Sequence, residues 1–372
     1  MRIALLLPAG DDAGARLDAH EFLAQAVQRG HHCALFASDW RAELPEGVVL
    51  REIAARGRSA HRRHAAFVEA VQQQLAGTSS DVVVGLQAMP GLDVLLASAG
   101  CYLQEAEGRS GWSARRGGAY RYFSQAEAAV CGPQATTRVL FQSELQREAF
   151  CSTYPQLASR SATLPPGVAA ARRPPADAQR LRRRMRAELQ LAEHELVLLF
   201  AGNDFERHGL GDAIHSLAAA RQEQPHQALR LLVAGGERSR RYHHLARKLG
   251  VGDAVHFLGW RDDLPELMAC ADVLIHPARE APVGRVLLEA LLAGLPVITS
   301  QNCGYAQHIA QAHAGSVLPE PLQPADLERA LLRMFDGVFR SQCRETGAAF
   351  VGLTDLGARM PAALAQIEQW FA

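Results

Sequence analysis

The sequence of 372 residues lacks any long uninterrupted apolar run, which excludes a membrane-spanning helix, since such a helix needs about 20 apolar residues. It has no excess of either charge, because 39 Lys and Arg residues balance 39 Asp and Glu residues, and this gives no overall attraction to nucleic acid. No Cys-x-x-Cys pair is present, so the seven scattered cysteines indicate reduced core thiols. The first apolar run, Ile3–Leu7, is too short for a signal peptide. We therefore expect a cytoplasmic protein.

What the sequence contains is a regular alternation of short apolar runs with helical segments. The first set of expected strands is 3–7, 32–37, 81–86, 138–141 and 161–164, with helices at 17–29 and 61–75. The second set of strands is 195–200, 229–234, 254–258, 273–276 and 297–299, with helices at 211–222, 240–249 and 286–293. This alternation predicts parallel sheets covered by helices on both faces.

The break between the two sets predicts two domains. Pro165-Pro166-Gly167 and Pro174-Pro175 bracket a linker-like stretch, since Pro and Gly interrupt regular structure. The expected division is 1–168, then 169–354, with a final helix at 355–372 packing back on the first domain. The predicted fold is α/β, with two Rossmann-like doubly wound domains facing across a cleft. Ligands in such sheets bind beyond the carboxyl ends of the strands.

The stretch from 276 to 300 carries the strongest functional pattern. A strand ends at His276, a loop follows, and a helix begins near Gly284. Backbone N–H groups of Gly284, Arg285 and Val286 at a helix start form a site for an anion such as a diphosphate. Glu289, one turn later, can accept hydrogen bonds from ribose hydroxyls. The alternative is that Glu289 is only a solvated helix residue, but its apolar neighbours would make an unpaired carboxylate costly.

Several stretches of the chain together resemble one family. They are MPGLD at 89–93, YRYF at 120–123, LPPG at 164–167, FERHG at 205–209, ADVLIHPA at 271–278, LLEALLAGLPV at 287–297 and CGYAQHIA at 303–310. With these motifs the chain resembles the lipopolysaccharide core glucosyltransferase I family, within the family-4 retaining glycosyltransferases, which have the GT-B fold. The resemblance runs over nearly the whole chain, and MPGLD and CGYAQHIA are its most specific parts.

The resemblance implies transfer of a hexose from a nucleotide-sugar, a uridine-diphosphate sugar, to the lipopolysaccharide core with retention at the anomeric carbon. It implies no cofactor and no metal, because helix dipoles and basic side chains take the role of a divalent ion. The expected catalytic residues are Asp18 and His208, at positions of the family pattern, together with Glu280 and Arg207, which stand next to such positions. The implied nucleotide-sugar-binding residues are Gly14, Arg207, His208, Arg261, Gly284, Arg285, Val286 and Glu289.

The chain departs from the family pattern at charged positions. The first of two family glutamates, eight positions before Glu289, is Ala281 here, and Glu280 stands one place earlier. His208 replaces a family lysine that neutralises the diphosphate, and the adjacent Arg207 can compensate. Ala99 replaces a family Asp, and only Gly14 matches a glycine pair in the first loop.

These departures leave two functional hypotheses of different class open. The first is a transferase with an altered donor or acceptor, and we favour it because Glu289, Arg207 and the helix-start anion site remain. The second is a noncatalytic binding protein of glycosyltransferase ancestry, associated with core assembly. A nicotinamide oxidoreductase is a weaker third, because Gly10 and Gly14 do not supply the required G-x-G-x-x-G turn.

A basic and aromatic stretch between 101 and 131 predicts peripheral contact with the cytoplasmic face of the inner membrane. The membrane-contact residues expected there are Arg109, Trp112, Arg115, Arg116 and Arg121. Basic groups attract anionic headgroups and aromatic rings settle at the interface. The alternative is an acceptor loop without lipid contact. A second arginine run, from 172 to 186, indicates a solvated interdomain helix, because it lacks the aromatic residues that stack on bases. The histidines are expected at the surface.

Overall fold

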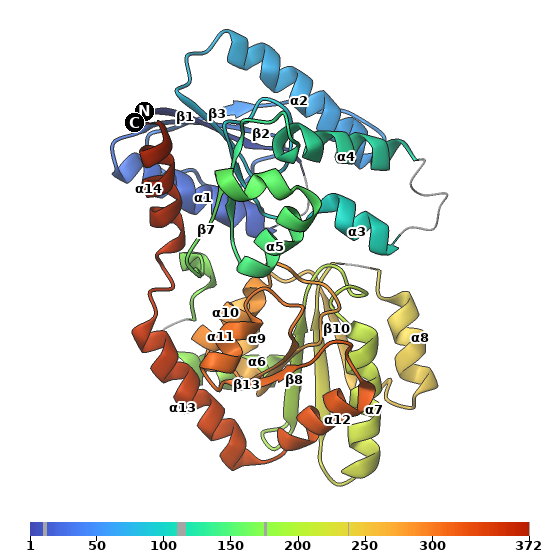
Figure 1. The fold of residues 1–372 in the computed structure, drawn as a ribbon. Coiled ribbons are helices and arrows are strands. Elements are labelled where there is room, and N and C mark those ends of the chain that lie inside the picture. The colour runs from blue at the N-terminus through green and yellow to red at the C-terminus, as the bar shows by residue number, and fades with distance from the viewer. Residues whose placement is uncertain (10–12, 110–116, 175–176, 237, 372) are drawn as a thin grey trace. The chain divides into compact units, whose positions relative to one another are not determined.

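The computed structural model divides the chain into two compact units. The first comprises 1–169 and 357–372, and the second comprises 170–356. Residues 1–9, 13–109, 117–174, 177–236 and 238–371 are described (Figure 1). The last helix thus belongs to the first unit, although it follows the whole of the second in the sequence.

The first unit is built on a parallel sheet of seven strands in the order β3-β2-β1-β4-β5-β6-β7. The strands are β1 (Arg2–Leu7), β2 (His32–Ala37), β3 (Val48–Glu52), β4 (Val82–Gly85), β5 (Val94–Leu96), β6 (Arg138–Phe141) and β7 (Ser161–Thr163). The helices are α1 (Ala13–Gln28), α2 (Ala60–Ala76), α3 (Tyr102–Arg109), α4 (Gly118–Cys131), α5 (Glu144–Thr153), the short η2 (Pro155–Arg160) and α14 (Arg359–Phe371).

Both faces of this first sheet are buried. Ile3, Leu5 and Leu7 of β1 point into one apolar cluster, whereas Ala4 and Leu6 point into another on the opposite face. Successive side chains of a strand alternate between faces, so a strand that is apolar at every position must be covered twice. The continuous apolar run at the start of the sequence therefore gave the right prediction of a doubly covered strand.

The second unit is a parallel sheet of six strands in the order β10-β9-β8-β11-β12-β13. The strands are β8 (Leu196–Ala201), β9 (Leu229–Ala234), β10 (Val255–Gly259), β11 (Val273–His276), β12 (Val297–Ser300) and β13 (Gly315–Leu318). The helices are η3 (Ala170–Arg172), α6 (Ala178–Glu188), α7 (Leu210–Glu223), α8 (Arg240–Lys248), α9 (Leu264–Cys270), α10 (Arg285–Leu292), α11 (Ala306–Gln311), α12 (Pro324–Arg333) and α13 (Gly337–Leu353). Two such parallel sheets with helices confirm the predicted α/β, Rossmann-like architecture.

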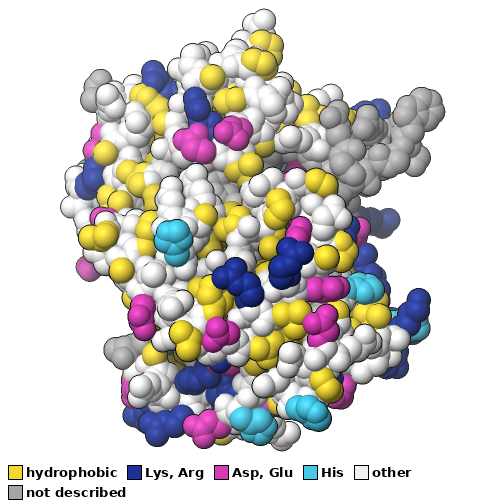
Figure 2. Space-filling view, turned by 60° about the horizontal axis from the view of Figure 1, so that its bottom comes forward, with side chains coloured by type: hydrophobic (Ala, Val, Ile, Leu, Met, Phe, Trp, Pro, Cys, Tyr) yellow, Lys and Arg dark blue, Asp and Glu magenta, His cyan; other side chains and the backbone are white. Residues whose placement is uncertain are grey.

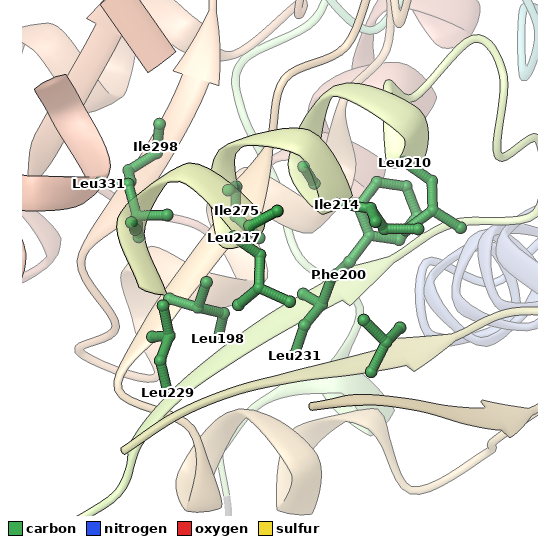
Figure 3. Packing of buried hydrophobic residues seen from close by; sticks show 14 of the residues in the cluster. Leu198, Phe200, Leu210, Ile214, Leu217, Leu229, Leu231, Ile275, Ile298 and Leu331 are labelled. Carbon is green, nitrogen blue, oxygen red and sulfur yellow. The ribbon is translucent and has the colours of Figure 1, made fainter. Parts of the chain in front are cut away.

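The core of the second unit forms where α7 packs on the centre of its sheet. Leu210, Ile214 and Leu217 from α7 lie over Leu198 and Phe200 of β8, and all five are fully buried (Figure 3). Truncating one such leucine to alanine typically costs about 2–5 kcal/mol. This packing fixes the start of α7 relative to the end of β8, and the loop between them carries the FERHG motif.

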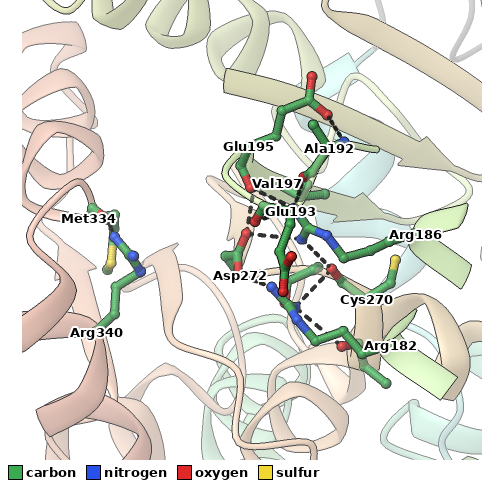
Figure 4. Close-up of polar contacts among 12 residues, drawn as sticks. Arg182, Arg186, Ala192, Glu193, Glu195, Val197, Cys270, Asp272, Met334 and Arg340 are labelled. Atoms are coloured by element: carbon green, nitrogen blue, oxygen red, sulfur yellow. Dashed lines mark hydrogen bonds and ion pairs between the residues drawn. The ribbon is translucent and has the colours of Figure 1, made fainter. Parts of the chain in front are cut away.

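A polar network stabilises the amino-terminal ends of β8 and β11. Asp272 accepts hydrogen bonds from Arg182 at 2.7 Å, from Arg186 at 3.4 Å and from the Val197 backbone at 2.8 Å (Figure 4). Arg186 is only 6% exposed. The prediction of a solvated helix holds for the exposed Arg180, Arg183 and Arg184 of α6 but was wrong for Arg186. An arginine run looks solvated in the sequence, but the buried Asp272 that pairs with it lies 86 residues later.

The sequence prediction missed three strands. β3 is an edge strand that alternates exposed and half-buried positions, β5 has three residues, and β13 begins at a glycine. None presents the four- to eight-residue apolar run that marks a buried strand. The final helix begins at Arg359 and not at 355, because α13 continues to Leu353 and a turn separates the two helices.

Candidate functional site

The candidate site lies at the carboxyl edge of the second sheet. Because all its strands are parallel, the segments after β8, β10 and β11 emerge at the same edge. The first contains Arg207 and His208, the second Arg261, and the third Glu280 and Gly284. This is the edge at which open α/β sheets bind ligands.

The loops after β8 and β11 are joined to each other. The Arg279 backbone N–H donates to the Arg207 carbonyl at 2.8 Å. Gly209 has a φ of 78°, and a Cβ there would clash with the Pro277 carbonyl, so only glycine fits this left-handed position. Residues distant in sequence, Arg207 and Glu280, are thereby brought together.

Arg207 and Glu280 form a long ion pair at this junction. The Arg207 Nε lies 3.5 Å from Glu280 Oε2, and the side chains are 18% and 38% exposed. Asp204 fixes the loop by accepting from the Arg207 backbone at 3.1 Å. Glu280 is the more exposed member of the pair, and Arg207 is the more buried one.

Beside it, His208 packs against a second histidine. The His208 and His276 ring centroids are 4.9 Å apart. Burial lowers the pKa of His208 to about 4, Asp204 opposes this shift, and Arg207 adds to it. Burial also lowers the pKa of His276, which is 2% exposed, so the prediction of surface histidines was wrong for this residue. His64, 6% exposed in the first unit, is a second exception. The His208 and His276 imidazoles are both neutral at pH 7 because of these lowered pKa values.

The start of α10 is shaped by the chain that follows β12. Gly284 has a φ of 63°, and a Cβ there would clash with Cys303 Sγ and lie 3.1 Å from the Gly304 backbone nitrogen. Cys303 and Gly304 begin the CGYAQHIA motif. The packing explains why this motif accompanies the glycine that opens the helix. Glu289, one turn into α10, is half-buried.

The position of the missing family glutamate is occupied by backbone pairing. The Ala281 N–H donates to Asn302 O at 3.1 Å, and the Gly304 N–H donates to Ala281 O at 2.9 Å. The Ala281 side chain is 6% exposed. Glu280, and not Ala281, is thus the residue of this loop whose side chain reaches Arg207.

Arg261, predicted to bind the nucleotide-sugar, is paired with the neighbouring Asp263. It forms two hydrogen bonds to Asp263, at 2.7 and 2.5 Å, and these bonds raise its pKa. It follows β10, which is two strands away from β8. Trp260, which the sequence prediction overlooked, is 41% exposed and lies over Gly236. An aromatic residue directly after a strand end was the available signal.

Asp18, predicted as catalytic, is in the first unit and almost inaccessible. It is 1% exposed and lies 2.5 Å from Arg359 Nη2, which is itself 2% exposed. Arg359 also donates to Gln142 at 3.0 Å. The arrangement ties α14 to α1. Gly14 is the second residue of α1, and Ala99 is exposed just beyond β5.

The residues predicted to contact a membrane are only partly described. Trp112, Arg115 and Arg116 lie outside the described residues, and Arg109 is the last residue of α3. Arg121 is exposed on α4. Tyr122 donates to or accepts from His64 Nδ1 at 2.9 Å, so it serves the fold. Across the described residues, no helix combines the length and apolar character needed to cross a membrane.

Comparison with known proteins identifies the family of the chain. Residues 182–349 match the family model "Glycosyl transferases group 1". The chain is 34% identical over 318 residues to lipopolysaccharide glucosyltransferase WaaG of Escherichia coli K12, which covers 86% of this chain and 85% of the relative.

Solved structures give the same result. The crystal structure of WaaG superposes with a TM-score of 0.88 at 31% identity and covers 97% of this chain and 98% of that one. HepE of Anabaena, in complex with UDP and glucose, shares the fold with a TM-score of 0.75 at 17% identity, covering 99% of this chain and 100% of that one. The chain therefore belongs to the lipopolysaccharide core glucosyltransferase I family of group 1 glycosyltransferases and has the GT-B fold.

Proposed function

We propose that this chain transfers a hexose from a uridine-diphosphate sugar to the lipopolysaccharide core, with retention at the anomeric carbon and without a metal ion. The observation that carries the proposal is the junction of the loops after β8 and β11, which places Arg207 and Glu280 3.5 Å apart at the ligand-binding edge of the second sheet. The similarity to WaaG supports the acceptor class.

The donor is held by groups of the second unit. The start of α10 and the guanidinium of Arg207 receive the diphosphate, because helix N-termini and arginine both favour phosphate oxygens. Glu289 accepts hydrogen bonds from the ribose hydroxyls. His208, neutral when the site is empty, takes up a proton from solvent as the diphosphate binds, because the negative charge favours the imidazolium form.

The reaction requires charge stabilisation more than a strong base. The bond between the anomeric carbon and the diphosphate oxygen breaks, and the acceptor oxygen bonds to the same face of the sugar. The acceptor proton passes to the leaving diphosphate. Arg207 stabilises the charge that develops on that leaving group, and Glu280 holds the guanidinium in position through its ion pair.

The place of action follows from the acceptor. A lipopolysaccharide precursor is anchored in a lipid leaflet, so the proposal includes peripheral binding to the cytoplasmic face of the inner membrane. Exposed Arg121 on α4 supports such contact, since each basic group near an anionic surface contributes about 1 kcal/mol.

The test is acceptor-dependent release of nucleotide from a panel of uridine-diphosphate sugars, with truncated lipopolysaccharide core as acceptor. Arg207→Ala should reduce release about 10²–10³-fold. The matched control is Arg279→Ala, because Arg279 lies in the same junction but is 61% exposed and pairs with Asp212 at 3.0 Å. Nucleotide binding without release across the panel would instead favour a noncatalytic binding protein, in which Ala281, His208 and Ala99 mark lost turnover.

A further inference from the structure

A surface pocket of about 420 Å³ lies in the second unit between α8 and the edge strand β10. Its lining residues are Ser239, Arg240, His243, Ala246, Arg247, Gly252, Val255 and Phe257. The volume falls within the range of small-molecule sites, which is about 300–1,000 Å³. None of these residues belongs to the loops that form the candidate donor site.

The polar wall of the pocket is basic because of helix periodicity. Arg240, His243 and Arg247 are three, four and seven residues apart, so they share one face of α8. Ser239, which precedes the helix, adds a hydroxyl. Figure 2 shows Lys, Arg and His side chains together at the right-hand margin, on the side where Figure 1 places α8.

The two arginines of this wall are available for a ligand. Within the described part of the chain, neither Arg240 nor Arg247 has a hydrogen bond or an ion pair through its side chain. Arg241, by contrast, is neutralised by Glu206 at 3.0 Å. The aliphatic part of the Arg247 side chain packs against Gly252. A Cβ at position 252 would lie 3.0 Å from the Arg247 Cγ, so the absence of a side chain at Gly252 makes room for this contact.

The remaining wall is apolar and aromatic. The rings of His243 and Phe257 are in contact, with centroids 4.0 Å apart and planes inclined by 35°, and Val255 and Ala246 line the pocket beside them. Guanidinium groups bind phosphate oxygens, whereas aromatic and aliphatic side chains suit the C–H face of a sugar ring.

We propose that this pocket is a second binding site, distinct from the donor site, for the phosphomonoester of a phosphorylated monosaccharide unit. The phosphate lies between Arg240 and Arg247 with the Ser239 hydroxyl as a further donor, and the sugar ring lies against the Phe257 and His243 side chains. The site does not depend on the proposed transfer reaction.

The experiment is calorimetric titration of the full chain with glucose 6-phosphate in the presence of saturating UDP-glucose. Binding should persist in Glu289→Ala, because the two sites are separate. Arg247→Gln should weaken it about ten- to hundredfold, since a charge-assisted hydrogen bond is lost. Lys248→Gln is the matched control, because it removes the same charge from the next residue, which does not line the pocket. The His243 imidazole NMR signals should shift on titration in the wild type.

Other probes distinguish the sources of phosphate. Inorganic phosphate should compete weakly and glucose should not bind. Vesicles of phosphatidylglycerol should bind equally well to Arg247→Gln and Lys248→Gln if lipid headgroups are not the ligand. No binding of glucose 6-phosphate, equal loss in both variants, binding no tighter than that of inorganic phosphate, or vesicle binding lost only in Arg247→Gln would each overturn the proposal.

Discussion

One arginine–carboxylate pair in the first unit and one in the second together include three of the four residues that the sequence predicted to be catalytic. In the first unit, Asp18 and Arg359 are 2.5 Å apart and no more than 2% exposed. In the second unit, Arg207 and Glu280 are 3.5 Å apart and partly exposed. The first pair is buried, whereas the second remains partly in contact with solvent. The same two types of side chain therefore lie in different surroundings, and the difference is their burial.

The reason lies in desolvation. A buried ion pair is stable only while both charges are present, because removal of one leaves the other without water or partner. A partly exposed pair keeps its solvent, so losing one member costs the fold little. The buried pair should consequently report on folding and the exposed pair on activity.

The largest effect is expected for Asp18→Asn. The change leaves Arg359 buried without a counter-charge and should lower the free energy of unfolding by about 3–5 kcal/mol. Urea denaturation measures it. Asp18→Leu combined with Arg359→Met should recover most of the loss, because both buried charges are then removed. A stable, inactive Asp18→Asn protein would instead return Asp18 to the catalytic site.

Arg207→Ala is expected to have the opposite signature. Loss of the charge facing the leaving diphosphate should reduce kcat about 10²–10³-fold, while the free energy of unfolding changes by less than about 1 kcal/mol. Single-turnover kinetics and denaturation should be compared with those of Arg279→Ala. Equal activity of the two variants would remove Arg207 from the site.

Glu289→Ala tests the nucleotide side of the same site. We expect uridine-diphosphate binding to weaken about ten- to hundredfold, because a charged acceptor for the ribose hydroxyls is lost. Calorimetry provides the measurement. Glu223→Ala is the control, since Glu223 is exposed at the far end of α7. Undiminished binding in Glu289→Ala would contradict the assignment.

The smallest effect is a pH dependence that arises from His208. Its pKa is lowered to about 4 in the empty site, and a bound diphosphate raises it, so binding takes up a proton. Affinity for UDP-glucose, whose phosphates do not titrate in this range, should rise by less than about tenfold in all as pH falls from 8 to 5.5. The facing groups are His276, Asp204 and Arg207.

Two variants separate this effect from other titrations. His208→Lys should bind tightly with a flat profile, and His208→Gln should bind weakly with a flat profile. The sign for folding is the reverse, because a buried neutral histidine loses stability as pH falls from its unfolded pKa of about 6.5 toward 4. A sloping profile in His208→Gln would assign the proton to another group.

Much of the fold could be predicted because its signals are local. The apolar runs at 229–234 and 273–276 are the observed strands β9 and β11 without any change of boundary. Prediction failed where the signal was weak, as in the half-exposed β3, and where the partner was remote, as for Arg186 and Asp272. An arginine's surroundings depend on a carboxylate that may come from anywhere in the chain, and no local pattern reveals it.

By itself, the sequence determined the α/β alternation, the division into two sheets and the family, because each rests on periodicity or on motifs of adjacent residues. Only the tertiary structure decided which ionisable groups meet. It sealed Asp18 beneath Arg359, joined Arg207 to Glu280, buried His276 against His208 and left Arg240 and Arg247 open in a pocket. These outcomes depend on desolvation and on contacts between distant segments, and both arise only when the chain is packed.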